Sequence, residues 1–492
     1  MKDYTFKKVM VRFKNSLKVL VFMAGVLGMV CFLSNLLERR SAENKYAQFF
    51  DEQNDFDVLF LGTSHVVDAV YPLELWNDYG IVSYNFGGHG NQMATNYWVL
   101  VNAMDYTTPE LVVVDCTCLS SNAKTSEVSI EQTHVAMDAF PITPNKIKAV
   151  NDLFENPKDK ASFVWDFLTY HDRWSELTGS DFSPVENQLK GAEYHIRVSV
   201  PSKFEKVPRE QKSRDDTIGV EYLIKIIEFC EERGIEVLLT YVPFPALEFK
   251  QEEANLAYDI AERYGLNYIN FLDMDVVDYA TDCLDPGSHL NPSGGRKVTD
   301  YLGNYIVSNY HIQDRRQEER YKQWHEDYKK GTAYKFDKIR KLEDLDAYLC
   351  MLADKNVNSC IYIRSDSPIL KDERMALLLK NISSQIQMSE INGDRGYFLL
   401  VDHAGQGLIE CTDGSLQNIE TSFGRVNYTC DAEIRELYVN SQEENYLVQL
   451  DSGADEPDVQ IVTVDGITGK IEHNCKFVYD INSGFANAVL WE

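Results

Sequence analysis

Short apolar runs alternate with amphipathic segments along much of this 492-residue chain. The apolar runs are typical of strands buried on both faces of a parallel sheet. They cover residues 57–61, 81–86, 111–115, 236–241 and 267–271. Apolar positions at helical spacing predict helices over residues 220–233, 247–264 and 296–308. Strands that alternate with helices predict an α/β domain over about residues 50–310, with a parallel sheet covered by helices on both faces.

Two segments depart from this pattern. Residues 120–215 are polar and rich in Trp, Phe and Tyr, and they predict a helical insertion between the third and fourth strands. Long inserts at strand ends often shape a substrate cleft, but a packed lid that never touches substrate fits the sequence equally well. Residues 311–340 are dense in charged and aromatic side chains and predict a solvated linker helix between domains.

The remainder of the chain, residues 341–492, has the pattern of a separate α+β domain. Strand-like runs recur at residues 359–363, 397–401, 446–450 and 460–464. Residues 373–383 predict a helix, and Asp465-Gly466 and Thr468-Gly469 are turn signals between strands.

Residues 19–37 form an apolar run without a charged side chain. About 20 apolar residues span a membrane as a helix. A buried core helix would be shorter and amphipathic. A cleaved signal peptide would have a shorter apolar region and a small-x-small cleavage site, whereas this run ends in Ser34-Asn35-Leu36-Leu37. Residues 1–18 carry six basic side chains against one Asp, so the positive-inside bias places them in the cytoplasm. The sequence therefore predicts a single-pass membrane anchor, with everything after about residue 40 outside.

The charge and the cysteines exclude some classes of function. The formal net charge is −29 despite the basic start, so the body of the protein is strongly acidic. Nucleic-acid binding needs a basic surface, and no nucleic-acid partner is expected. The ten cysteines show neither a CxxC motif nor a metal-binding Cys/His spacing. Most are expected to be buried thiols, although one or two disulfides also fit the sequence.

Two motifs at strand ends could form a serine-based acyl-transfer site. Gly62-Thr63-Ser64 follows the first predicted strand, at the edge where open α/β sheets bind ligands. Asp285 and His289 lie four residues apart in a loop before the last predicted helix of the α/β domain. In such sites a histidine takes the proton of the nucleophilic serine, and a carboxylate orients the histidine ring. The alternative is that Asp285 only forms an Asx turn and that Asn291 or Ser293 caps the helix.

A glycine-rich segment, Tyr84-Asn85-Phe86-Gly87-Gly88-His89-Gly90-Asn91, follows the second predicted strand. Glycine lets backbone N–H groups approach an oxyanion closely, although a plain turn is the alternative. Gly90 is therefore an expected oxyanion donor. All three motifs fall at carboxyl ends of predicted strands, in the order Ser, Gly, His.

That order resembles the SGNH (GDSL-like) hydrolase superfamily. Three blocks carry the resemblance: Gly62-Thr63-Ser64, then Asn85 with Gly87 and Gly90, and finally Asp285 with His289-Leu290-Asn291. Gly-Thr-Ser-His beside an N-terminal anchor resembles the D-alanyl-lipoteichoic acid biosynthesis (DltD-like) and alginate-acetyltransferase-like branch. The resemblance covers about residues 50–310. It implies a flavodoxin-like parallel sheet and a catalytic Ser64, His289 and Asp285.

The sequence departs from the family pattern in the first block and in the segment after the third predicted strand. Thr63 replaces an Asp at a position that varies among anchored members. The Asn expected after the third strand is replaced by Cys116-Thr117-Cys118-Leu119. Asn91 or Asn122 would have to supply that oxyanion or substrate-binding donor.

The last block also departs from the family, because one extra residue separates Asp285 from His289. Pro286 and Gly287 could absorb it. Otherwise the orienting carboxylate is missing or comes from Asp282.

Histidines in the three motifs raise the question of a metal site. His65, His89 and His289 are candidates, but no carboxylate or cysteine lies at ligand spacing to support them. No metal and no other cofactor is therefore expected, and His65 is expected to line the mouth of the site.

The C-terminal domain resembles the interleukin-like (ILEI-type) domain family. The resemblance rests on residues 359–366, 377–380, 396–402 and 460–469. It implies a carbohydrate- or partner-binding accessory, and a structural spacer fits nearly as well.

Together these features predict a membrane-anchored, extracytoplasmic serine esterase or O-acyltransferase. Ser64 would attack an ester carbonyl with His289 as base, and the N–H groups of Ser64 and Gly90 would hold the oxyanion. Topology and resemblance imply a cell-surface polysaccharide or teichoic-type polymer as substrate. A transferase would also need an acyl donor and a multi-span membrane partner. The alternative is a non-catalytic cell-surface protein of the same fold that binds a glycan or a partner.

Overall fold

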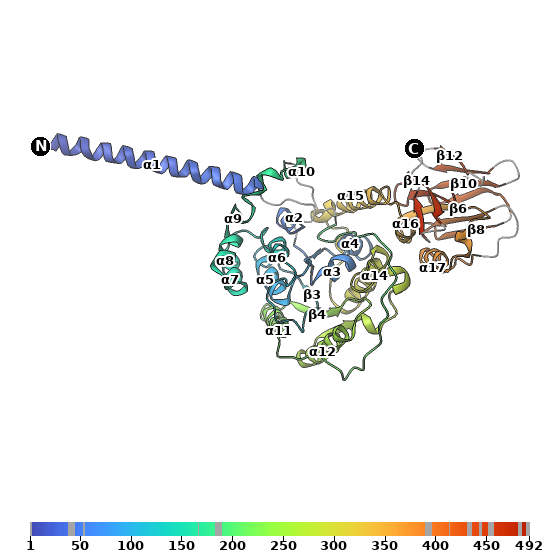
Figure 1. Cartoon of the computed structure of the whole chain (residues 1–492), viewed down its shortest axis with the longest axis horizontal. Coiled ribbons are helices and arrows are strands. Elements are labelled where there is room, and N and C mark those ends of the chain that lie inside the picture. The colour runs from blue at the N-terminus through green and yellow to red at the C-terminus, as the bar shows by residue number, and fades with distance from the viewer. Residues whose placement is uncertain are drawn as a thin grey trace.

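The computed structural model describes most of the chain. The described residues are 2–37, 45–52, 55–165, 167–182, 189–388, 396–412, 414–430, 435–441, 445–450, 457–480 and 485–488. Helix α1 (Lys2–Leu37) projects away from a central α/β unit, and a strand-rich unit lies on the other side of that unit (Figure 1).

A five-stranded parallel sheet forms the centre of the α/β unit, as predicted. Its strands are β1 (Val58–Leu61), β2 (Ser83–Asn85), β3 (Leu111–Asp115), β4 (Glu236–Tyr241) and β5 (Asn267–Asn270). Their order is β2-β1-β3-β4-β5, with neighbours parallel throughout. This is one of the common doubly wound orders, and it places a topological switch point at the carboxyl ends of β1 and β3.

Helices cover both faces of the sheet, because successive strand residues point to opposite sides. One face packs against α3 (Ser64–Ala69), α4 (Pro72–Tyr79) and α14 (Pro292–Asn309). The other packs against α5 (Met93–Ala103), α11 (Ile218–Glu231) and α12 (Glu248–Tyr264). Thus Phe60 and Val113 belong to the first core, whereas Leu59 and Val112 belong to the second. The three helices predicted from periodicity are present as α11, α12 and α14.

The insertion between β3 and β4 is helical only in its first part. Its elements are α6 (Ile130–Met137), α7 (Pro144–Leu153), α8 (Pro157–Val164), α9 (Phe167–Tyr170), η1 (Arg173–Ser175) and α10 (Gly179–Phe182). Residues 189–217 have neither helix nor strand. The backbone N–H of Asn85 donates to Lys190, and that of Ser202 donates to Pro286. This segment therefore runs from the end of β2 to the loop that carries Asp285.

The charged segment after α14 is less solvated than predicted. It forms η3 (Glu319–Tyr321) and α15 (Lys322–Ile339). Trp324 is fully buried in the core of the α/β unit, and Lys335 and Phe336 are also buried. One face of α15 therefore packs into the protein, and only the other is solvated.

The C-terminal unit contains two antiparallel sheets. The larger has the order β15 (Phe485–Ala488), β14 (Ile471–Asp480), β13 (Val459–Asp465), β6 (Val357–Ile363), β7 (Tyr397–Asp402) and β8 (Gly407–Cys411). The smaller has the order β12 (Asn445–Gln449), β11 (Arg435–Ser441), β10 (Gly424–Cys430) and β9 (Leu416–Thr421). One core lies between the two sheets. A second core joins the larger sheet to α16 (Leu345–Leu352) and α17 (Glu373–Ile382).

Two further expectations concern α1 and the cysteines. Residues Lys14–Ser34 of α1 are long and apolar enough to cross a membrane, and none of this stretch is buried. A membrane anchor and a signal sequence both fit such a helix. All ten cysteines are free thiols, and most are buried.

Candidate active site

The turn after β1 places Ser64 at the carboxyl edge of the sheet. A Cβ atom on Gly62 would lie 2.4 Å from Cγ2 of Val66 and 2.9 Å from Cβ of Asp115, so the turn has room only for glycine. Thr63 caps α3, since its side chain accepts a hydrogen bond from the N–H of His65 at 3.3 Å. Ser64 thus becomes the first residue of α3, at the switch point of the sheet.

A buried polar chain supports this turn from below. The hydroxyls of Thr63 and Thr117 lie 3.1 Å apart, and the Thr117 hydroxyl donates to Asp115 at the end of β3. The other Asp115 oxygen accepts the N–H of Val242 at 2.9 Å. Burial raises the pKa of Asp115 to about 6, although these donors oppose the effect. Hydrogen bonds therefore join the ends of β1, β3 and β4 beneath Ser64.

Ser64, His289 and Asp285 form one continuous hydrogen-bonded series. Oγ of Ser64 lies 2.7 Å from Nε2 of His289, and Nδ1 of His289 lies 2.5 Å from Oδ2 of Asp285. The side chains of His289 and Asp285 are 26% and 34% exposed, so the series is open to solvent. This is the geometry in which a histidine can take the serine proton while a carboxylate orients its ring.

The extra residue between Asp285 and His289 is absorbed by the turn. Oδ1 of Asp285 accepts the N–H groups of Gly287 and Ser288 at 3.0 and 2.7 Å, which leaves Oδ2 for His289. Asp282 is not the orienting carboxylate. It is fully buried and forms an ion pair with Lys297 at 2.6 Å.

Asp285 remains a carboxylate in this setting. Burial pushes its pKa upward, but hydrogen bonds from Gly287, His289 and Ser288 outweigh that effect and hold the pKa below its ordinary value. The Asx turn and the orienting role, which the sequence presents as alternatives, therefore occur together.

His65 lies against the ring of His289. Its ring stacks on His289 at 5.1 Å between centroids and on Phe244 at 4.3 Å. Burial, followed by the nearby His289 and Lys250, holds the pKa of His65 well below its ordinary value. A neutral His65 therefore supports the orientation of the His289 ring.

Two backbone donors near the site remain available, one in the glycine-rich segment and one at the start of α3. Gly87 N–H donates to Oδ1 of Asn85, and Gly88 N–H donates to the carbonyl of Gly62. Gly90, by contrast, has a φ of +69°, and among the described residues no acceptor engages its N–H. The same is true of the Ser64 N–H at the start of α3 within the described part of the chain.

The two asparagines considered as oxyanion donors have other roles. Asn91 is 2% exposed, and its amide nitrogen contacts Oδ1 of Asn96 at 3.1 Å and the hydroxyl of Tyr46 at 3.4 Å. Both amide hydrogens of Asn91 thus have partners inside the protein. The side chain of Asn122 lies at the start of α11, where it accepts the N–H of Ile218. The amide of Asn91 is therefore not free to bind an oxyanion, which corrects the expectation for Asn91.

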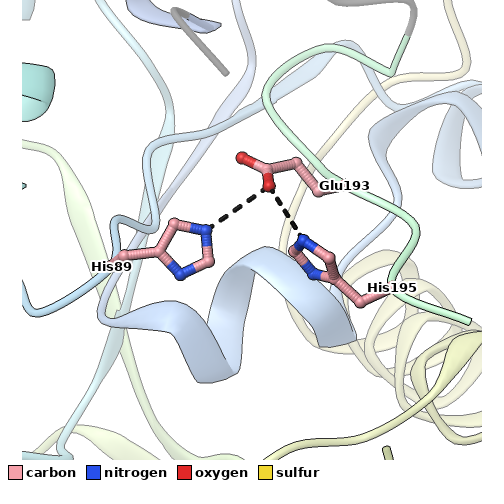
Figure 2. A group of neighbouring side chains, drawn as sticks. All are labelled: His89, Glu193 and His195. Atoms are coloured by element: carbon pink, nitrogen blue, oxygen red, sulfur yellow. Dashed lines mark hydrogen bonds and ion pairs between the residues drawn. The ribbon is translucent and has the colours of Figure 1, made fainter. Parts of the chain in front are cut away.

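A second polar cluster lies beside this site, and it was not predicted. His89 is close to Glu193 and His195, and one ligand atom from each of the three lies within 4.8 Å of the others. In Figure 2 the Glu193 carboxylate lies between the two imidazole rings. The expectation that no carboxylate joins these histidines is wrong for His89. The missed signal is the pair Glu193 and His195, two residues apart, which share a side in an extended segment.

A scan against protein-family models found no match for this chain, and a search of curated proteins found no significant relative.

Proposed function

We propose that this protein is a serine esterase or O-acyltransferase of the SGNH type. The observation that carries the proposal is the series from Ser64 Oγ through His289 to Asp285, with contacts of 2.7 and 2.5 Å. The strand order and the position of Ser64 at the switch point support it.

The chemistry follows from these positions. His289 Nε2 takes the Ser64 proton while Oγ bonds to the ester carbonyl carbon, and Asp285 stabilises the imidazolium. The N–H groups of Ser64 and Gly90 are the donors for the oxyanion. Imidazolium then protonates the departing alkoxide, which leaves an acyl group on Ser64. Water or a glycan hydroxyl, deprotonated by His289, removes that acyl group.

The proposed location is the outer face of a membrane. Support comes from the exposed apolar stretch of α1, together with the six basic side chains that precede residue 19. A site held there would act on acyl esters of a cell-envelope polymer, such as a polysaccharide or a teichoic-type polymer. The C-terminal unit would then bind carbohydrate or a partner, as its interleukin-like sequence pattern suggests.

A fluorophosphonate probe tests the proposed chemistry. The full chain in detergent is treated with the probe, and the labelled peptide is identified by mass spectrometry. We expect labelling at Ser64 that is lost in Ser64→Ala and strongly slowed in His289→Ala, with Ser288→Ala as a neighbouring control. A folded protein that is not labelled would instead indicate a non-catalytic binding protein.

A further inference from the structure

Three parts of the chain meet beside Ser64. His89 comes from the glycine-rich segment after β2, and Glu193 and His195 come from the irregular part of the insertion. The backbone N–H of Glu193 donates to Val67 in α3, the helix that begins at Ser64. The cluster therefore lies about one helical turn from the proposed nucleophile.

The two spacings between the Glu193 carboxylate and the imidazoles fit a tetrahedral cation. Oε2 of Glu193 lies 3.4 Å from Nε2 of His89 and 3.4 Å from Nε2 of His195. Two ligands on a tetrahedral zinc ion are about 3.4 Å apart when each metal–ligand bond is about 2.1 Å. By comparison, the usual N–H···O distance is about 2.9 Å, so these contacts are long for direct hydrogen bonds.

A buried carboxylate fixes the orientation of one of the rings. Nδ1 of His195 lies 2.7 Å from Oδ1 of Asp68, whose side chain is 3% exposed. When Nδ1 donates to Asp68, the lone pair of a neutral His195 is on Nε2, which points toward the Glu193 oxygen (Figure 2). Two electron-rich atoms that face each other need a positive charge between them, which a proton on Nε2 or a bound cation supplies. A carboxylate behind a metal-binding histidine is a frequent arrangement in zinc sites.

We propose that His89, Glu193 and His195 bind a divalent transition-metal cation, with zinc as the best fit. Two imidazoles and one carboxylate suit zinc, and three protein ligands leave a fourth position for water or a substrate oxygen. The half-exposed side chains of His89 and His195, 40% and 41% accessible, leave that position open to solvent. Asp68 is a positioning residue for His195.

Such an ion would have a structural consequence for the neighbouring site. It would tie the glycine-rich segment, which carries Gly90, to the irregular segment of the insertion. The proposal does not depend on the chemistry proposed for Ser64, because it rests on a different set of side chains.

Metal binding to the full chain in detergent provides the test. Protein without a polyhistidine tag is first stripped of metal with a chelator. It is then incubated with zinc sulfate and desalted. Zinc is then measured by plasma mass spectrometry, and affinity by calorimetric titration. We expect one zinc per chain. Cobalt(II) in place of zinc should give the intense visible absorption of a tetrahedral site.

Variants separate this site from adventitious binding. Glu193→Gln and the double variant His89→Ala/His195→Ala should lose the stoichiometric zinc. The exposed controls Glu228→Gln and His311→Ala should retain it. Asp68→Asn should weaken zinc affinity by roughly 10- to 100-fold at unchanged stoichiometry. Circular dichroism of the metal-free proteins verifies folding.

Two results would overturn the proposal. One is a folded wild-type chain that binds no zinc at micromolar concentration. The other is zinc binding that is equally tight in wild type, Glu193→Gln and the double variant. Because Ser64 labelling is not among the readouts, either result leaves the proposed acyl chemistry standing.

Discussion

At the scale of single residues, Asp285 combines two roles. One of its carboxylate oxygens shapes the turn through the N–H groups of Gly287 and Ser288, and the other contacts His289. A local turn thus places an orienting carboxylate without the help of a distant element. Since its pKa is held below the ordinary value, Asp285 stays charged throughout the neutral range.

Replacing this carboxylate should affect turnover far more than folding. In Asp285→Asn the amide can still accept the turn hydrogen bonds, but it cannot stabilise an imidazolium. We expect kcat for p-nitrophenyl acetate to fall by roughly 10,000-fold, as it does when the orienting Asp of a Ser-His-Asp triad becomes Asn. Asp275→Asn is the control, because Asp275 is an exposed carboxylate in the same region of the chain. An equal loss in both variants would argue against the assigned orienting role.

How well the sequence predicts this region depends on the separation of the residues. Asp285 and His289 share one loop, and Ser64 follows a recognisable strand, so local patterns were sufficient to find them. Glu193 and His195 come from an insertion without regular structure, about a hundred residues after His89 in the sequence. Only the tertiary path of that insertion brings them together. The burial of Asn91 depends in the same way on distant contacts.

At the scale of elements, the start of α14 holds the loop that carries His289. Oδ1 of Asn291 accepts the N–H groups of Ser293 and Gly294, and its amide donates to the carbonyl of Thr281 at 2.8 Å. One side chain therefore caps the helix and also fixes the chain before Asp285. The capping role considered for Asn291 in the sequence is confirmed.

Removing this cap should weaken both the fold and the site. For Asn291→Ala we expect a loss of about 1–3 kcal/mol in the free energy of unfolding, because a cap is lost and a buried carbonyl is left without its donor. Urea unfolding followed by circular dichroism measures this loss. Asn309→Ala, at the exposed end of the same helix, should change stability by less than about 0.5 kcal/mol. Equal stability of the two variants would contradict the assigned role.

The predicted and the missed strands differ in their burial. The five strands of the parallel sheet are almost wholly buried, so their apolar runs are visible in the sequence. Strand β9 has only Leu416 and Ile419 as apolar positions and is largely exposed. Strands of this kind are fixed by pairing with their neighbours rather than by a continuous apolar run. Of the smaller C-terminal sheet, the apolar pattern therefore predicts only the strand at residues 446–450, which is β12.

At the scale of the whole molecule, a buried ionic network joins the α/β unit to the C-terminal unit. Asp354, which lies between α16 and β6, accepts hydrogen bonds from Lys335 of α15 and from Arg296 of α14. Glu74 of α4 lies 3.4 Å from the same lysine. All four side chains are at least nine-tenths buried. Water cannot solvate these buried charges, so they compensate one another. The contact between the two units therefore depends on the four charged side chains together.

Neutralising Asp354 should destabilise the protein strongly at neutral pH and much less in acid. In Asp354→Asn, Lys335 and Arg296 lose their shared carboxylate, and breaking a buried ion pair costs about 3–5 kcal/mol. Burial pushes the pKa of Asp354 upward, but Lys335 and Arg296 outweigh burial and lower it. A lowered folded-state pKa adds stability above the unfolded pKa of about 4, and that stability is lost as the pH falls toward the folded value. The difference in the free energy of unfolding between wild type and variant, measured by urea unfolding, should therefore be full at pH 7 and shrink below about pH 4.

The control is Asp366→Asn, which removes an exposed partner of Arg364 and should cost at most about 1 kcal/mol. If Asp354→Asn were no more harmful than Asp366→Asn at pH 7, the network would not be what holds the two units together.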